Sequence, residues 1–251
     1  MKRPLHARTI LVTRPLGRAD KLCQRIHDAG GYALHYPLIA ILPPRDRHCL
    51  ADIKHHLYQF DIAIFISPTA VEQTAELLPS IPKTLQIAAI GSKTAAMLQQ
   101  HGILVSIQTE GHNSESLLTH PALQPAVVSN RQILIFRGEG GRAFLGDSLR
   151  QRGAQVRYIE TYRRGLPDAA PLSDDTIRQL DAITISSNEG LDNLMTLTAN
   201  PAAILNTPII VASDKTVKNA HSYGFTAIYQ ADNATDEACY TQLQALFKPA
   251  E

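Results

Sequence analysis

The sequence predicts an α/β protein built from two similar domains, each a parallel β-sheet with helices on both faces. Two observations support this fold class. Short apolar runs rich in β-branched residues alternate with helical patterns along the chain, and the whole alternating pattern occurs twice. Strands that alternate with helices through short connections are typical of parallel sheets covered by helices. The length of 251 residues also suits two compact domains.

The elements follow one another as pairs of one strand and one helix. The predicted pairs are 10–12 with 18–29, 62–66 with 70–78, 87–90 with 94–100, 133–136 with 143–152, 182–185 with 191–197, and 209–212 with 217–223. Two further segments, 35–44 and 156–164, have the pattern of extended chain and lie where the chain would cross between domains.

Similar motifs recur at a nearly constant displacement along the chain. The matching positions are Arg14 and Arg137 at 123 residues, Gly30 and Gly153 at 123, Ser67 and Ser187 at 120, and Lys93-Thr94 and Lys215-Thr216 at 122. Any two α/β halves share strand and cap patterns, but the matching Arg and Lys-Thr positions favour two diverged copies of one flavodoxin-like unit. The repeat leaves open whether the domains are consecutive or have exchanged their first strand and helix. Two copies facing each other would place a ligand in the cleft between them.

Composition argues against several classes of protein. The formal net charge of +1, from 24 basic and 23 acidic residues, offers no field of one sign to attract nucleic acid or a membrane surface. No stretch approaches the ~20 apolar residues of a membrane span, and the apolar run 9–13 is too short for a signal peptide. Three widely spaced cysteines without a CxxC pair suit a reducing compartment. We therefore expect a cytoplasmic protein.

Four hydroxyl residues, Ser67, Thr94, Ser187 and Thr216, follow predicted strands at or near the start of a helix. In a parallel sheet these positions lie at the carboxyl edge, where α/β proteins bind ligands. Such hydroxyls, together with the free N–H groups of helix N-termini, make anion sites without a cationic side chain. Simple N-capping explains each residue taken alone, but equivalent places in two copies favour a shared binding site.

Three other motifs do not meet the requirements of the sites that they resemble. A P-loop needs glycine directly before its lysine, where Ser92 and Asp214 stand. The run 138–142 matches the glycine spacing of a dinucleotide loop only in part. The histidines and cysteine of 48–56 would project from a helix in different directions, which favours a solvated face over a metal site. We expect neither nucleotide nor metal binding.

Tyr162 lies near the end of the second extended segment. A phenol at this place can donate a proton or hold an oxygen atom. An aromatic side chain that only packs between domains explains the same residue, so the pattern alone leaves both interpretations open.

Taken together, several motifs resemble the uroporphyrinogen-III synthase family over nearly the whole chain. They are Ile10-Leu11-Val12-Thr13-Arg14-Pro15, Phe65-Ile66-Ser67-Pro68-Thr69-Ala70-Val71, Ala89-Ile90-Gly91, Phe136-Arg137-Gly138, Ile159-Glu160-Thr161-Tyr162-Arg163-Arg164 and Ile183-Thr184-Ile185-Ser186-Ser187. Their order and spacing carry the resemblance.

The resemblance implies two α/β domains joined by a two-stranded β-ladder. Domain one would comprise 1–36 and 166–251, domain two 45–155, and the ladder 37–44 and 156–165. In this arrangement the first strand and helix pack in the domain that the C-terminal part completes.

The resemblance also implies the reaction. Such enzymes, which are lyases of haem biosynthesis, dehydrate the linear tetrapyrrole hydroxymethylbilane and close it with inversion of ring D, without metal or organic cofactor. Tyr162 would then be the catalytic residue. The substrate-binding residues would be Arg14, Ser67, Thr94, Arg137, Gly138, Ser187 and Thr216. The partner would be this small molecule alone, with a transient contact to the enzyme that makes it left open. The alternative is a two-domain cytosolic protein that closes on an anionic ligand without chemistry.

Overall fold

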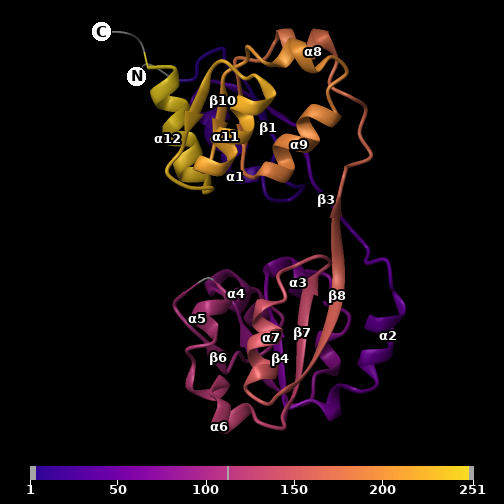
Figure 1. Ribbon diagram of the computed structural model, residues 1–251. Helices are drawn as coiled ribbons and strands as arrows, with labels where there is room; N and C mark the ends of the chain where they lie inside the picture. Colours follow the sequence, from indigo (N-terminus) through magenta and orange to yellow (C-terminus); the bar gives the residue numbers. More distant parts are fainter. Residues whose placement is uncertain (1–3, 112, 249–251) are drawn as a thin grey trace. The chain divides into compact units, whose positions relative to one another are not determined.

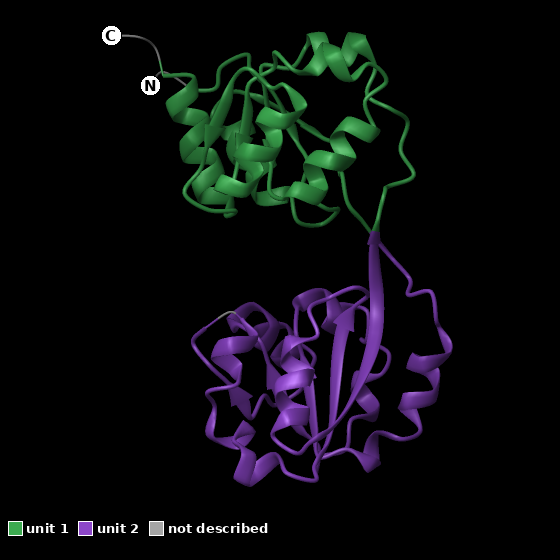
Figure 2. Ribbon diagram, in the orientation of Figure 1, with its two compact units in different colours: residues 1–40, 165–251 green, residues 41–164 purple. Residues whose placement is uncertain are grey.

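The computed structural model describes residues 4–111 and 113–248 and divides the chain into two compact units. Figure 2 shows unit 1, residues 1–40 and 165–251, in green and unit 2, residues 41–164, in purple. The ends of the predicted domain one, 1–3 and 249–251, lie outside the described residues. Along the chain, unit 2 is thus inserted between the two pieces of unit 1.

Unit 1 is a five-stranded parallel sheet with helices on both faces (Figure 1). Its strands are β1 (Thr9–Val12), β2 (Tyr32–His35), β9 (Ala182–Ile185), β10 (Ile209–Val211) and β11 (Ile228–Gln230), in the order β11-β10-β9-β1-β2. The helices α1 (Asp20–Asp28) and α12 (Asp236–Leu246) pack on one face. The other face is covered by α8 (Asp174–Arg178), α9 (Asn188–Thr196), α10 (Pro201–Ile204) and α11 (Asp214–Tyr223).

Unit 2 is a six-stranded sheet of the same layered design. Its strands are β3 (Ala40–Leu42), β4 (Ile62–Phe65), β5 (Gln86–Ala89), β6 (Ile107–Gln108), β7 (Gln132–Gly138) and β8 (Gln155–Gly165), in the order β3-β8-β7-β4-β5-β6. The helices α2 (His48–Lys54), α3 (Pro68–Glu72) and α4 (Ser92–Gln100) pack on one face. The other face carries α5 (Ser114–Leu117), α6 (Pro125–Val128) and α7 (Phe144–Gln151).

The pairing register confirms the internal repeat. Equivalent residues face each other in both sheets: Ile10 with Ala182 and Ile133 with Ile62, Ile10 with Ala33 and Ile133 with Val156, Ile209 with Ile183 and Ile87 with Ala63, Ile210 with Tyr229 and Ala88 with Ile107. Without β3, both sheets therefore have the flavodoxin-like strand order, as predicted. In unit 2 the chain enters at the third strand of that order and makes the first two strands last.

An ion pair at the amino end of each sheet repeats as well. In unit 1 Arg8 lies 2.6 Å from the Asp181 carboxylate, which also accepts the N–H of Thr9 at 2.8 Å. In unit 2 the Asp61 carboxylate accepts from Arg131 at 2.6 Å and from the Gln132 N–H at 2.8 Å. Each aspartate thereby connects the residue before one central strand to the start of the neighbouring strand in the sheet: Asp181 connects β9 to β1, and Asp61 connects β4 to β7.

The strands are apolar because both faces of each sheet are covered. All four residues of β4 are buried, as are all four of β9, which is typical of a parallel sheet between two helical layers. In unit 2 the rings of Phe65 and Phe136 stack across adjacent strands at 4.6 Å, an arrangement that contributes about 0.5–1.5 kcal/mol beyond burial of their area.

Helix α3 is shorter than the sequence indicates, since it ends at Glu72 where the pattern predicts a helix to residue 78. The Thr74 hydroxyl donates to the carbonyls of Ala70 and Val71 at 2.7 and 3.0 Å. Such bonds compete with the helical pattern, and the chain continues as turns to a 3₁₀ turn at Leu78–Ser80. Within 4–111 and 113–248, the helices are all too short or too polar to cross a bilayer.

Candidate functional site

Each sheet has one switch point. At this point the connection from one central strand leads toward one edge of the sheet, and the connection from the neighbouring strand leads toward the other edge. This place lies between β1 and β9 in unit 1 and between β7 and β4 in unit 2. Open α/β sheets bind ligands outside the carboxyl ends of the strands at this switch point. Arg14 and Ser187 follow β1 and β9, while Gly138 and Ser67 stand at the ends of β7 and β4. The sequence therefore brings a predicted site residue to each of these four strand ends.

Ser67 and Tyr162 form the most specific contact at the switch point of unit 2. The Tyr162 Oη lies 3.3 Å from the Ser67 Oγ. Ser67 begins α3, and its Oγ also accepts the N–H of Ala70 at 3.1 Å. Only 6% of Tyr162 is exposed. Its ring is thus fixed by packing, and its hydroxyl is held beside a second hydroxyl.

Gly138 lies directly opposite Tyr162 in the β7–β8 pairing. A Cβ atom at residue 138 would lie 2.7 Å from the Tyr162 Cζ and 3.1 Å from its Oη. Tyr162 therefore occupies the space that a side chain at this position would need, so the conformation of the phenol depends on glycine at 138.

Arg137 lies next to the end of β7, and its guanidinium is engaged within unit 2. It lies 3.1 Å from the Glu160 carboxylate and 4.2 Å above the ring of Tyr158. It also donates to the Arg142 carbonyl at 3.4 Å. Its Nε is buried and has no hydrogen-bond partner in the structure. The side chain is 11% exposed, so only a part of this cation reaches the surface.

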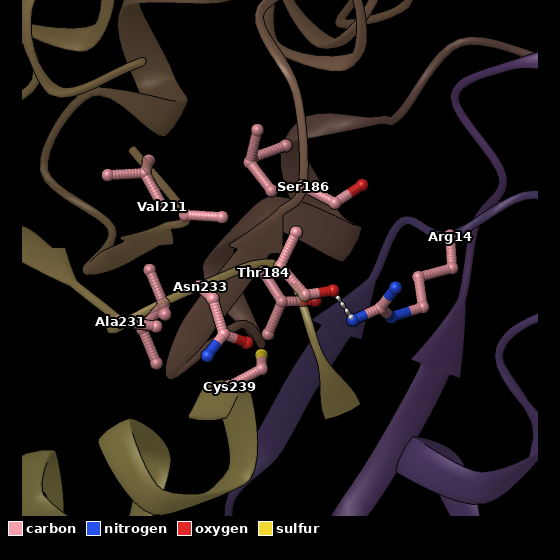
Figure 3. A pocket seen from close by; sticks show the side chains of 11 residues that line it. Arg14, Thr184, Ser186, Val211, Ala231, Asn233 and Cys239 are labelled. Atoms are coloured by element: carbon pink, nitrogen blue, oxygen red, sulfur yellow. Dashed lines mark hydrogen bonds between the residues drawn. The ribbon is translucent and has the colours of Figure 1, made fainter. Parts of the chain in front are cut away.

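Arg14, at the matching position of unit 1, is also engaged by partners within its own unit. Its Nε lies 2.8 Å from the Asp236 carboxylate, and its guanidinium donates to the Ala234 carbonyl at 2.8 Å. Figure 3 shows Arg14 beside a small hollow that Thr184, Ser186 and Cys239 also line. The hollow encloses about 10 Å³, the space of one water molecule. It is too small for a large ligand, and Arg14 ties the loop before α12 to β1.

The buried Cys239 thiol also lines this hollow. Burial raises the pKa of Cys239 from its ordinary value of 9.0 to about 12, although the nearby Arg14 acts in the opposite direction. At neutral pH this thiol is therefore protonated, and it serves as an apolar side chain of the core.

Of the four predicted hydroxyl residues, the structure puts the serines at helix starts and buries the threonines. Ser187 begins α9 and accepts the Gly190 N–H at 3.1 Å, the same cap that Ser67 makes in unit 2. Thr94 and Thr216 are 1% and 2% exposed and lie in the first turn of α4 and α11. Thr216 bonds back to Ser213 at 2.9 Å, so its hydroxyl points into the helix start.

The residues that start α4 and α11 are not among the predicted site residues. Gly91, at a φ of +79°, precedes α4, and Ser213 caps α11. Exposed lysines, Lys93 and Lys215, follow them in the first turn of each helix. The repeated Lys-Thr pair is the sequence signal for these helix starts, and in both copies the lysine is exposed and the threonine is buried.

The cluster of histidines and a cysteine in 48–56 does not gather into a metal site. Cys49 donates to the Asp46 carboxylate at 2.9 Å, and His56 bonds the Asp52 carbonyl at 2.9 Å. Across the described parts of the chain, no three His, Cys, Asp or Glu side chains come close enough together to hold a metal ion.

Known proteins resemble this chain over most of its length. The model of the family described as uroporphyrinogen-III synthase HemD matches residues 20–241. The chain belongs to this family. A uroporphyrinogen-III synthase from Escherichia coli (strain K12) is 31% identical over 250 residues, which cover 94% of this chain and 100% of that protein. The enzyme of the same name from Proteus mirabilis is 38% identical over 163 residues, covering 62% and 80%.

Solved structures of the same family share the fold. A uroporphyrinogen-III synthetase from Helicobacter pylori 26695 has a TM-score of 0.61 at 16% identity and covers 95% of this chain and 99% of that chain. A mutant uroporphyrinogen III synthase from Thermus thermophilus has a TM-score of 0.59 at 19% identity, with coverage of 97% and 100%. The uroporphyrinogen-III synthase fold of two parallel-sheet α/β units is therefore confirmed for this chain.

Proposed function

We propose that this protein is a uroporphyrinogen-III synthase that dehydrates hydroxymethylbilane and closes it into uroporphyrinogen III with ring D inverted. The observation that carries the proposal is the family match over residues 20–241, combined with a tyrosine hydroxyl held at the switch point of unit 2. The same match makes the protein an enzyme of porphyrin biosynthesis, and we place its reaction among the lyases.

In the proposed reaction Tyr162 acts on the leaving hydroxyl. Its Oη donates a proton as the carbon–oxygen bond breaks, and water departs. The pyrrole nitrogen supplies the electron pair, and its own proton returns the phenolate to phenol. The azafulvene that forms is attacked by the substituted carbon of ring D, and the spiro intermediate fragments and recloses with that ring turned over. The substrate is reactive by itself, so positioning contributes more than strong acid or base.

The carboxylate side chains of the substrate need donors on the protein. We propose that the first-turn N–H groups of α4 and α11, next to Lys93 and Lys215, receive some of them. In this proposal Thr94 and Thr216 stabilise those turns from the inside, since both are buried. Ser187 and Gly138 lie at strand ends where a ligand approaches. Arg14 and Arg137 contribute charge from positions fixed by Asp236 and Glu160.

The test uses freshly generated hydroxymethylbilane, with the ring isomers separated after oxidation to porphyrins. We expect the isomer with inverted ring D to form in excess and faster than closure in buffer. If only the uninverted isomer appeared, at the rate seen without protein, the enzymatic proposal would be wrong. Binding of the substrate in that case would support a ligand-binding protein without catalysis.

A further inference from the structure

The β7–β8 ladder contains one extra residue next to the candidate site. Arg137 pairs with Glu160, but the next residue, Gly138, pairs with Tyr162, so Thr161 has no partner of its own. This is a β-bulge, a feature that re-aims a side chain. The Thr161 hydroxyl donates to the Arg137 carbonyl at 3.2 Å, and the Glu139 N–H donates to the Tyr162 carbonyl at 2.8 Å. Bonds on both sides therefore fix the bulge.

The bulge decides which face of the sheet Tyr162 occupies. Side chains of a strand alternate between faces, so a regular strand would put Tyr162 on the face of Glu160. With the bulge, Tyr162 instead packs in the same core as Ile159 and Phe136. That is the face of α3, where Ser67 lies. Without Thr161 as the extra residue, the phenol would not reach the Ser67 hydroxyl.

The Ser67 hydroxyl takes part in both the helix cap and the contact with Tyr162. Its Oγ accepts the Ala70 N–H at 3.1 Å and still has its own hydrogen and a second lone pair, so either hydroxyl can donate in the 3.3 Å contact with Tyr162 Oη. When Ser67 donates, the hydrogen of the phenol is free for another acceptor. Ser187 makes the same cap in unit 1, but the residue 123 positions before Tyr162 is Ile39, so unit 1 lacks the phenol.

We propose that Ser67, Gly138 and the bulge at Thr161 act together as a positioning device for the Tyr162 hydroxyl. Ser67 donates to the phenol oxygen, so that the phenol proton is directed to the leaving hydroxyl and the phenolate is stabilised after transfer. Gly138 provides the space for the ring. This inference rests on the proposed catalytic role of Tyr162. It assigns Ser67 a role through Tyr162 in place of a direct contact with substrate.

The first test is a mutant cycle between residues 67 and 162. Ser67→Ala should lower kcat about 2- to 10-fold with KM within about twofold, the effect of one lost neutral hydrogen bond. Ser67→Thr keeps the cap and the donor and should restore most of kcat. In the Tyr162→Phe background, Ser67→Ala should cause no further loss, because the two residues act as one unit. Ser173→Ala removes a matched cap from the five-residue helix α8 and should leave kcat unchanged.

The second test displaces the Tyr162 ring by adding a methyl group at residue 138. Gly138→Ala places a methyl group 2.7 Å from the Tyr162 Cζ, so we expect kcat to fall at least as far as in Tyr162→Phe. Gly141→Ala is the control, since the nearest atom to its Cβ would be at 3.6 Å. Thermal unfolding of all variants separates loss of folding from displacement of the phenol.

The outcomes distinguish this inference from the proposed function. A wild-type kcat and product isomer in Tyr162→Phe would reject the catalytic role of Tyr162 itself. If Tyr162→Phe is slow but Ser67→Ala keeps the full rate, only the positioning role is wrong. An equal loss from Ser67→Ala in both backgrounds, or a rise in KM alone, would show that Ser67 contacts the substrate directly and would also overturn the inference.

Discussion

Arg14 and Arg137 occupy matching positions in the two units but bind different partners. Arg14 reaches Asp236 at the start of α12, whereas Arg137 pairs with Glu160 on the neighbouring strand and stacks on Tyr158. One ancestral position thus supports a loop in unit 1 and a strand end in unit 2. The same substitution should therefore have different consequences in each.

Arg14→Gln should destabilise unit 1 by about 1–3 kcal/mol, since it removes one ion pair and one charge-assisted hydrogen bond and leaves Asp236 partly buried without its cation. Amide exchange should accelerate in α12 and in the loop before it, while the strands of unit 2 keep their protection. Uniform acceleration in both units would contradict this assignment.

Tyr162→Phe should lower kcat about tenfold or more and leave stability nearly unchanged. The ring still fills its place in the core, but the proton donor is lost. Steady-state kinetics and thermal unfolding measure the two effects. If the variant instead lost enough stability to account for the fall in kcat, Tyr162 would have a packing role only.

Lys93→Met and Lys215→Met should each raise KM about 2- to 5-fold at low salt, because exposed cations at the first helical turns contribute weak, screened attraction to carboxylates. The difference from wild type should shrink as salt is added. Lys83→Met is the matched control: this exposed lysine precedes β5, at the opposite end of the strand. An equal rise in KM for the control would show a general charge effect.

Asp61→Ala should destabilise only unit 2, and Asp181→Ala should destabilise only unit 1. Each carboxylate accepts one arginine and one backbone N–H, so its loss costs about 1–3 kcal/mol in its own unit. The Thr9 amide should exchange faster only in Asp181→Ala, and the Gln132 amide only in Asp61→Ala. Each variant serves as the control of the other, and cross effects would refute independent units.

Cys239 should make stability fall at alkaline pH. Its pKa is about 12 in the folded chain against an ordinary 9.0, so the neutral thiol favours folding below pH 9 and this contribution is lost as pH rises toward 12. The full difference is on the order of 4 kcal/mol. Urea unfolding of wild type and Cys239→Ala, compared between pH 8 and pH 10, should show a steeper decline in wild type. Parallel curves would contradict the expected shift.

The sequence alone predicts much of the fold because the central strands are continuous apolar runs. The six predicted strand–helix pairs all occur, with altered ends such as that of α3. The edge strands β6 and β11 were not predicted, since they contain only 107–108 and 228–230 and carry no run long enough to stand out. Helix α12 was also missed, although Thr235 and the acidic residues after it form an N-terminal signal.

The candidate site was predictable only in part. Strand ends locate Ser67, Ser187 and Gly138, because in a parallel sheet the carboxyl edge follows from strand direction. Sequence could not show that Thr94 is buried, since a residue in the first turn of a helix faces the core or the solvent according to packing. The bulge at Thr161 is likewise invisible in the sequence, because the shift depends on how β8 pairs with β7.

The insertion of unit 2 into unit 1 sets an order for folding during synthesis. Residues 41–164 leave the ribosome as one continuous stretch and contain every strand of their unit except the first residue of β3 and the last of β8, so unit 2 can fold early. β1 is made before unit 2, yet its partner β9 begins at Ala182. Until then β1 and β2 have a free edge, which is a template for wrong pairing. The nascent chain therefore leaves one edge of β1 unpaired throughout the synthesis of unit 2.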